Sequence, residues 1–207
     1  YYVYVKKSCS TDLGSSNWRQ IAVTTLCGVS GYFTENFDTT STGTSANQTV
    51  PDCWFFIDSG VGFGYVSSAA DFSVPNGFYM SNGADTSSEY LLVSPKTENL
   101  GNGGARIRFR AKTTSSSTDP STTLKVVTLA NQENVIGMVQ VTEITLTTSF
   151  DEFVVNLPAG TNDYFAFMHG LNANSRVIYL DDIVYEPIPP CSSPSVLELD
   201  NVGVNSV

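Results

Sequence analysis

The stretch that most constrains the fold is residues 176–186, Arg-Val-Ile-Tyr-Leu-Asp-Asp-Ile-Val-Tyr-Glu. Its apolar and aromatic residues leave little room for solvent on either face, and the run stops at Pro187, which predicts a buried β-strand. Because successive strand side chains point to opposite faces, either Asp181 or Asp182 must point inward unless a bulge intervenes. A buried carboxylate requires hydrogen-bond donors or a hard cation such as Ca²⁺.

A second acidic strand is predicted at residues 33–38, Phe-Thr-Glu-Asn-Phe-Asp. We expect it to lie beside 176–186, so that the first and last strands of one domain meet with carboxylates between them. Two explanations of these carboxylates stay open. Either an ion binds them, or backbone N–H groups and Ser or Tyr hydroxyls satisfy them without metal.

The remaining sequence shows short apolar runs separated by turns rich in Gly, Asn and Ser, with no helical period. Many short strands of this kind predict an all-β fold, a sandwich or jelly roll. The expected strands are residues 54–57, 77–80, 90–93, 105–110, 124–129, 135–141, 153–157 and 164–168.

Charge and length limit the possible partners. The 20 acidic and 10 basic side chains give a formal charge of −10, which argues against nucleic acid as a partner. No apolar run approaches the length of a membrane span, so no membrane insertion is expected. Because the sequence starts at Tyr1 rather than Met, we expect a piece of a longer chain.

Two sets of side chains are candidates for ligand binding. The alternation in residues 105–110 places three cations on one strand face, which is either a ligand platform or a solvated outer sheet face. Aromatic residues in the expected loops either stack on sugars or grip a protein partner, or else fill the core. The candidates are Arg106, Arg108, Arg110, Phe63, Tyr65 and Phe72, with Phe78 and Tyr79 as further loop aromatics.

Catalysis is not expected. A Ser-His-Asp triad would have to use His169, the only histidine, and no Gly-x-Ser-x-Gly elbow accompanies it. A histidine at the end of an aromatic strand is more often structural. We therefore expect a protein that is not an enzyme.

Six short motifs fall in the order of a known family. They are residues 34–38, 50–54, 92–95, 107–111, 165–169 and 180–183. Together they resemble the MAM-like, cleaved-adhesin or "choice-of-anchor" jelly roll of secreted Bacteroidetes proteins, over about residues 31–186. The Tyr-x-Val-Tyr-Val start and Val-Thr-Thr at 23–25 resemble the last strands of a fibronectin type III domain, and residues 189–207 resemble the start of another.

The resemblance implies three parts. Residues 1–27 would be strands F and G of a fibronectin type III domain, 28–188 a concanavalin-like, MAM-like jelly-roll β-sandwich, and 189–207 a linker with the first strand of a following fibronectin type III domain. It implies a non-catalytic adhesion, ligand-binding or display module of a large bacterial cell-surface or secreted protein, exported by the type IX system. Its partners would be a carbohydrate or protein ligand, neighbouring domains of the same chain and the secretion machinery. The alternatives are a structural spacer and an accessory domain of an exported hydrolase.

The resemblance also implies a structural Ca²⁺. In related jelly rolls such an ion lies between an acidic residue of the first strand and an Asp of the last. These positions correspond here to Glu35 or Asp38 and to Asp181 or Asp182. Asp38 stands where many relatives carry Glu, so its reach is one methylene shorter.

The four cysteines have one expected bond within the chain. Cys9 and Cys27 end opposite poles of the first hairpin, roughly 20 Å apart, which is too far for a disulfide. The fibronectin resemblance implies that Cys9 and Cys191 bond cysteines outside this chain. It then favours a Cys27–Cys53 bond, with Cys27–Cys191 as the alternative, and either suits an oxidising, extracellular setting.

One surface modification is also implied by resemblance. Asp38-Thr39-Thr40 is similar to the acceptor pattern of Bacteroidetes O-glycosylation. Thr39 is therefore an expected acceptor, provided that its loop is exposed.

Overall fold

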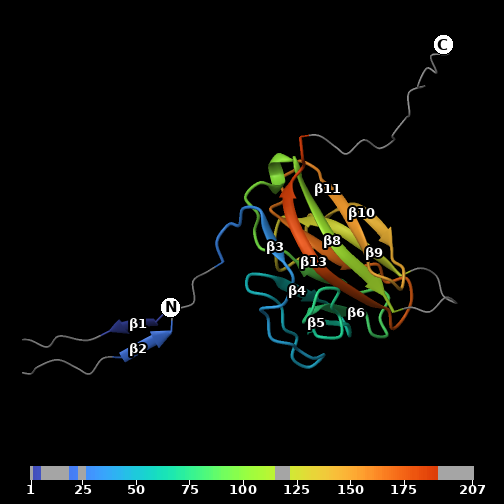
Figure 1. The fold of residues 1–207 in the computed structure, drawn as a ribbon, viewed down its shortest axis with the longest axis horizontal. Coiled ribbons are helices and arrows are strands. Elements are labelled where there is room, and N and C mark those ends of the chain that lie inside the picture. Colours follow the sequence, from blue (N-terminus) through green and yellow to red (C-terminus); the bar gives the residue numbers. More distant parts are fainter. Residues whose placement is uncertain (1, 6–18, 23–26, 115–121, 191–207) are drawn as a thin grey trace, which may run out of the picture.

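The computed structural model describes residues 2–5, 19–22, 27–114 and 122–190. From residue 27 onward, the described chain forms two antiparallel β-sheets that pack face to face (Figure 1). This is an all-β jelly-roll sandwich, which confirms the predicted fold class. A short 3-10 turn, η1 (Leu100–Asn102), is the one helical element in the described ranges. No helix among these residues has the length and apolar character to cross a membrane.

One sheet has five strands in the order β10-β9-β12-β7-β4, and all neighbours are antiparallel. Most strands that follow one another in the chain lie in opposite sheets, which is the connection pattern of a jelly roll. The strands of this sheet are β10 (Val139–Thr145), β9 (Thr123–Leu129), β12 (Tyr164–His169), β7 (Tyr90–Val93) and β4 (Phe55–Asp58).

The other sheet has six strands. Five follow the order β11-β8-β13-β6-β5, and the sixth, β3, pairs with β13. Its strands are β11 (Asp151–Leu157), β8 (Ala105–Thr113), β13 (Val177–Pro187), β6 (Gly77–Ser81), β5 (Phe63–Ser67) and β3 (Phe33–Glu35).

The core lies between the two sheets and is rich in aromatic rings. Burial alternates strictly along β8: Ile107 and Phe109 are fully buried, while the arginines between them are partly exposed. Phe109 meets Phe167 of the opposite sheet edge to face, with ring centroids 4.8 Å apart. Period-2 alternation on each inner face thus supplies the apolar surface that holds the sheets together.

The first and last strands of the sandwich are neighbours, as predicted. Strand β3 pairs antiparallel with β13, and Phe33, Thr34 and Glu35 lie opposite Tyr185, Val184 and Ile183. The register of β13 against β8 shifts between Asp181 and Val184. Asp182 has a φ of 48°, in the left-handed region that Asp tolerates better than most residues. Asp182 therefore lies in a bulge that begins after Asp181.

The predicted disulfide between Cys27 and Cys53 is present, with Cα atoms 5.4 Å apart. It excludes the alternative Cys27–Cys191 pairing. Cys9 and Cys191 lie outside the described residues. The bond joins the entry of the sandwich to Cys53, which lies two residues before β4 of the five-stranded sheet.

Two of the expected elements differ from the structure. The sequence predicts a loop around Phe63 and Tyr65, but these residues belong to β5, where Gly64 packs so closely against the ring of Phe56 that a side chain would collide with it. The strand expected at 135–141 begins only at Val139, because Gly137 has a φ of 75° and ends a turn there.

The described residues before position 27 form a two-stranded sheet. Strand β1 (Tyr2–Val5) pairs antiparallel with β2 (Arg19–Ala22). These are parts of the two strands expected near the start of the chain. The assignment of both chain ends to fibronectin type III domains stays a prediction.

Candidate functional site

Asp181 anchors a surface loop to the last strand. Its side chain is fully buried, and Oδ2 accepts hydrogen bonds from the backbone N–H groups of Phe72 (2.7 Å) and Ser73 (2.9 Å). Oδ1 accepts the N–H of Asp182 at 2.7 Å, and the Ser73 hydroxyl donates to Asp182 Oδ1 at 2.7 Å. Burial raises the pKa of Asp181 to about 6, and the three backbone donors oppose that rise. Both aspartates therefore hold the loop that carries Phe72.

The predicted ligands on the β3 side also have donors. Asp38 Oδ1 accepts the Asn76 N–H at 3.2 Å, and its Oδ2 accepts the Asn36 amide at 2.7 Å. Glu35 Oε1 accepts the Phe37 N–H at 2.6 Å. Among the described residues, no group of three or more His, Cys, Asp or Glu side chains could hold a metal ion. The hydrogen-bond donors around Asp181 and Asp38 are those that the metal-free alternative expects, and a bound calcium ion stays a prediction.

Glu35 also lines a cavity of about 580 Å³. Asp52 and the exposed Thr39 are part of its lining, and so is Thr49, whose Oγ1 is buried with no hydrogen-bond partner in the described structure. The pKa of Glu35 is raised mainly by burial, with the charges of Asp38 and Asp52 adding to the rise. The exposure of Thr39 meets the condition set for glycosylation, which itself stays a prediction.

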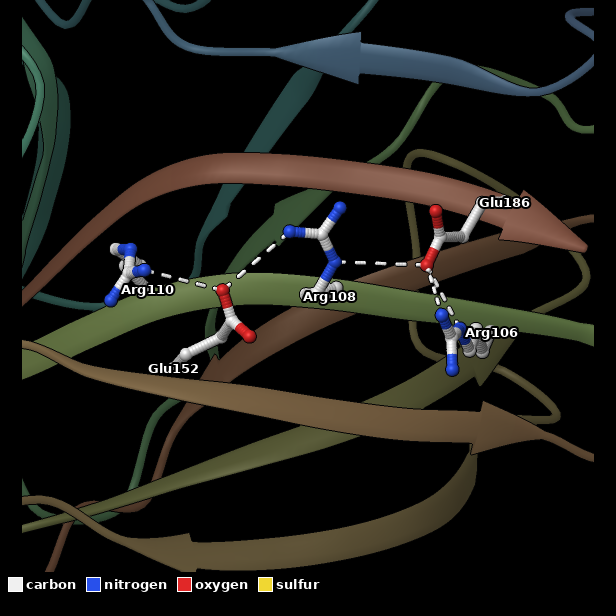
Figure 2. A network of polar contacts seen from close by, with 5 residues as sticks. All are labelled: Arg106, Arg108, Arg110, Glu152 and Glu186. Carbon is white, nitrogen blue, oxygen red and sulfur yellow. Dashed lines mark hydrogen bonds and ion pairs between the residues drawn. The ribbon is translucent and has the colours of Figure 1, made fainter. Parts of the chain in front are cut away.

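The three predicted arginines lie on the outer face of β8, where two glutamates pair with them in alternation (Figure 2). Glu186 Oε1 lies 2.7 Å from Arg106 Nη2 and 3.7 Å from Arg108 Nε. Glu152 Oε2 lies 3.5 Å from Arg108 Nη1 and 3.3 Å from Arg110 Nη2. We call these five residues the Arg–Glu ladder. Because both glutamates are shared, the ladder carries a formal charge of only +1, so it is far less cationic than the sequence alone indicates.

Next to the ladder, the outer face of the same sheet carries a cluster of aromatic rings. Tyr65 on β5 and Tyr79 on β6 are cross-strand partners with ring centroids 5.1 Å apart. Phe63 lies 6.1 Å from Tyr65 and 5.9 Å from Tyr79, in nearly parallel planes. Tyr179 on β13 meets Tyr79 edge to face at 5.5 Å. These four rings are partly exposed and belong to neither hydrophobic cluster of the fold.

The aromatic series continues across β8 through a lysine. Lys112 Nζ lies 5.1 Å from the ring centroid of Tyr179 and 4.5 Å from that of Phe150. Phe150 contacts Phe72 at 5.5 Å, and the guanidinium of Arg110 lies 4.1 Å over Phe72. Cations at these distances are attracted to the ring faces. We call the six rings the aromatic strip: Phe63, Tyr65, Tyr79, Tyr179, Phe150 and Phe72.

A cavity of about 430 Å³ adjoins the Phe72 end of the strip. It places polar side chains of different kinds beside an aromatic ring. The lining includes Asn36, Phe72, Arg108, Arg110, Glu152 and Asp182. Donors and acceptors that converge next to an apolar surface are typical of small-ligand sites.

The outer face of the five-stranded sheet is closed. A second hydrophobic cluster lies there, built on Leu91, Val93, Val127, Leu129, Ala166 and Met168. Val135 and Met138 of the segment 130–138 pack against it. The Gln132 side chain donates to Cys53 O at 2.7 Å and to Ser94 O at 2.9 Å, which ties the segment to the far strands of the sheet.

His169 is structural, as expected. It is fully buried, and its Nδ1 accepts the Leu171 N–H at 3.0 Å, so Nε2 carries the proton and donates to Arg176 O at 3.2 Å. Burial lowers the pKa of His169 to about 4. Neutral and enclosed, this ring is not placed for acid–base chemistry.

The sequence reasoning found part of this site. It named Phe63, Tyr65, Tyr79 and Phe72 as loop aromatics. The first three stand on strands rather than in loops, and Phe78, which it also named, is wholly buried in the core. It missed Tyr179, Lys112 and Phe150. The alternation of buried and exposed positions could have identified two of them, because Tyr179 and Lys112 occupy outward positions of β13 and β8, as the arginines do on β8. In the structure these two residues lie opposite one another in the strand register.

Comparisons with known proteins support the fold. No protein-family model and no curated protein sequence matches the chain. The K2 cleaved adhesin domain of Lys-gingipain is 19% identical with a TM-score of 0.57, covering 74% of this chain and 97% of that domain. The K1 domain, from Porphyromonas gingivalis W83, is 18% identical with a TM-score of 0.57, covering 75% and 98%.

A carbohydrate-binding module is similar as well. The CBM22-1 xylan-binding domain of Paenibacillus barcinonensis Xyn10C is 10% identical with a TM-score of 0.51, covering 75% of this chain and 93% of that one. At these identities the likeness shows a shared fold. The chain thus has the jelly-roll fold of cleaved adhesin domains and carbohydrate-binding modules.

Proposed function

We propose that this chain is a non-catalytic carbohydrate-binding module whose ligand face is the aromatic strip. The observation that carries the proposal is the strip itself: six rings in a series of contacts, four of them joined by ring–ring contacts and two reached through Lys112, outside both hydrophobic clusters. Phe72 at its end is 47% exposed. A contiguous exposed apolar surface with a polar rim is typical of an interaction site.

The chemistry of the face suits a sugar. Aromatic rings offer apolar faces to the C–H groups of a pyranose, and tyrosine hydroxyls add hydrogen bonds at the ring edge. Burial raises the pKa of Tyr79, so its hydroxyl stays protonated and can donate. The polar cavity beside Phe72 supplies further donors and acceptors, including Asn36 and Glu152.

The closed outer face of the other sheet leaves the strip as the better binding surface. The segment 130–138 fills the apolar face of the five-stranded sheet with Val135 and Met138. A sugar could reach that face only if the segment moved. On the six-stranded sheet no such rearrangement is required.

The setting is proposed from the fold and the disulfide. Cleaved adhesin domains of a gingipain and a xylan-binding module share the fold, and the Cys27–Cys53 bond suits an oxidising compartment. We place the module on the outside of a bacterial cell, in a longer Bacteroidetes surface or secreted protein that has fibronectin type III neighbours and is exported by the type IX system. A protein ligand, a pure spacer and an accessory domain of an exported hydrolase remain alternatives.

The test is glycan-array binding by the full chain, followed by affinity electrophoresis on the glycans that bind. Wild type is expected to bind, and Tyr79→Ala, at the centre of the strip, should lower affinity about tenfold, since stacking on one ring contributes on the order of 1–2 kcal/mol. Tyr32→Ala is the matched control, because Tyr32 is 46% exposed but lies outside the strip. A folded wild type that binds no glycan would favour the spacer.

A structural calcium ion is a second proposal, supported by the cavity next to Glu35. Glu35 and Asp52 line this cavity together with Thr49, whose Oγ1 has no partner in the described structure, and carboxylate and hydroxyl oxygens are ligands of the kind that Ca²⁺ prefers. The ion would stabilise the entry of the sandwich and take no part in catalysis. Ca²⁺ should raise the melting temperature of wild type over an EDTA-treated sample, and Glu35→Gln should remove this rise. Equal melting temperatures with Ca²⁺ and EDTA would contradict the proposal.

A further inference from the structure

Lys112 differs from the other cations on the outer face of the six-stranded sheet. Arg106, Arg108 and Arg110 all have carboxylate partners within 4.0 Å. For Lys112 the described structure shows two aromatic rings and no ion pair. The protein carries a formal charge of −10, so a lysine on a partly exposed sheet face would be expected to have an acidic neighbour.

Four acidic residues lie close to Lys112 along the adjoining strands, Asp151 and Glu152 on β11 and Asp181 and Asp182 on β13, and all have other partners. Asp182 Oδ1 accepts the Ser73 hydroxyl at 2.7 Å. Asp151 Oδ2 accepts the hydroxyl of Thr147 at 2.7 Å. Glu152 is shared between two arginines of the ladder. Asp181 is buried beneath the 72–73 backbone, with three N–H donors on its two oxygens. The positive charge of Lys112 is therefore not neutralised by the strands that flank it.

Lys112 also stands where a ligand on the strip would have to pass. Its ammonium group links Tyr179, at the end of the β5–β6–β13 rings, to Phe150 and Phe72 beyond β8. A pyranose stacked on Tyr179 would bring its ring substituents next to this nitrogen. An ammonium held between two ring faces is partly desolvated, which strengthens its pairing with an anion.

From this geometry we infer that the ligand of the aromatic strip is a glycan carrying an acidic sugar, whose carboxylate pairs with Lys112 while neighbouring sugars stack on the rings. The inference rests on the proposed carbohydrate-binding function and specifies its ligand class. It predicts one acidic sugar per site and not a polyanion. Only one cation of the strip lacks an anionic partner in the described structure, and a highly charged chain would be repelled by a protein of charge −10.

The test uses matched pairs of sugars that differ only in the acid. One pair is lactose and sialyllactose, and the other is xylotetraose with and without a single glucuronic acid branch, which separates sialylated from glucuronylated ligands. Binding to the full chain is measured by titration calorimetry at low ionic strength. In at least one pair the acidic member should bind about five to ten times more tightly, and the preference should shrink with added salt.

Three variants assign this preference to the lysine. Lys112→Gln should bring the ratio of affinities near one, whereas Lys112→Arg, which keeps the charge, should retain it. Lys125→Gln is the matched control, because Lys125 lies on β9 of the opposite sheet and has no ion pair in the described structure. It should keep the wild-type ratio.

The outcomes separate the two proposals. Equal affinity for both members of each pair, or a preference that survives Lys112→Gln, would overturn the acidic-sugar inference while leaving carbohydrate binding intact. If none of the four sugars binds, the inference fails as stated. The proposed function fails with it only when the glycan array is blank as well.

Discussion

Asp181 and His169 are fully buried titratable side chains whose pKa shifts have opposite effects on stability. The folded state takes up a proton at Asp181 below about pH 6, whereas the unfolded chain does so only near pH 4. Acidification through that window therefore stabilises the fold. At His169 the unfolded chain is protonated below about pH 6.5 and the folded protein only below about 4, so the same acidification destabilises it. Between about pH 6 and 4 the two contributions nearly cancel.

Replacing either residue should expose the contribution of the other. In His169→Gln, the free energy of unfolding relative to wild type should rise by about 3 kcal/mol between pH 6.5 and 4, since each pKa unit corresponds to about 1.4 kcal/mol. The measurement is urea denaturation across that pH range. Asp181→Asn should change with the opposite sign. A pH profile of His169→Gln parallel to that of wild type would contradict the buried neutral histidine.

At the scale of elements, β8 is held to both neighbouring strands by the Arg–Glu ladder. Glu152 reaches it from β11 and Glu186 from β13, so one series of ion pairs spans three strands. Each side chain is partly exposed to solvent, between 25% and 40%. Screening by water and salt therefore limits each pair to a small contribution.

Glu152→Gln should lower stability by about 0.5 to 1 kcal/mol at low salt, because it leaves Arg110 without its carboxylate and removes one of the two partners of Arg108. The difference should fall in molar salt. Urea denaturation of wild type, Glu152→Gln and the exposed Glu133→Gln at both salt concentrations measures it. A loss as large in high salt as in low would mean that packing, and not charge, carries the effect.

The Cys27–Cys53 bond joins two cysteines that are 26 positions apart in the sequence and both precede β4. The double variant Cys27→Ser, Cys53→Ser should lose about 3 kcal/mol, because the bond restricts the unfolded chain. Thermal denaturation of wild type with and without reductant, beside the double variant, measures this. Reductant should have no effect on the variant, and an unchanged melting temperature after removal of the bond would contradict the expectation.

Strands were predictable where one face is apolar and the other is not. The alternation in β8 and the apolar run in β13 predicted both strands, and the acidic residues of β3 and β13 predicted that these two strands are neighbours. Prediction from the sequence pattern failed at β5, since glycines that permit close packing look the same in sequence as glycines that make turns. The pattern predicted that the three arginines share one face of β8, but it did not predict the two glutamates that reduce the net charge of that face. Glu152 and Glu186 reach it only through strand pairing, which no local pattern encodes.

At the scale of the whole molecule, the two sheets expose different kinds of surface. The outer face of the six-stranded sheet presents rings, arginines and a polar cavity to solvent. The outer face of the five-stranded sheet is apolar and would attract other chains if bare, but the segment 130–138 covers it. One sandwich therefore combines an open binding surface with a closed apolar one.

This difference predicts that loosening the cover leaves glycan binding unchanged. Gln132→Ala removes two hydrogen bonds, to Cys53 O and Ser94 O, and should lower stability by about 1 to 2 kcal/mol while speeding hydrogen exchange in residues 130–138. Gln140→Ala, at an exposed position of β10, is the control. Affinity for a bound glycan should equal that of wild type, whereas Tyr79→Ala should weaken it. If Gln132→Ala changed the affinity and Tyr79→Ala did not, the ligand would bind the five-stranded sheet, because the segment 130–138 lies between that sheet and solvent.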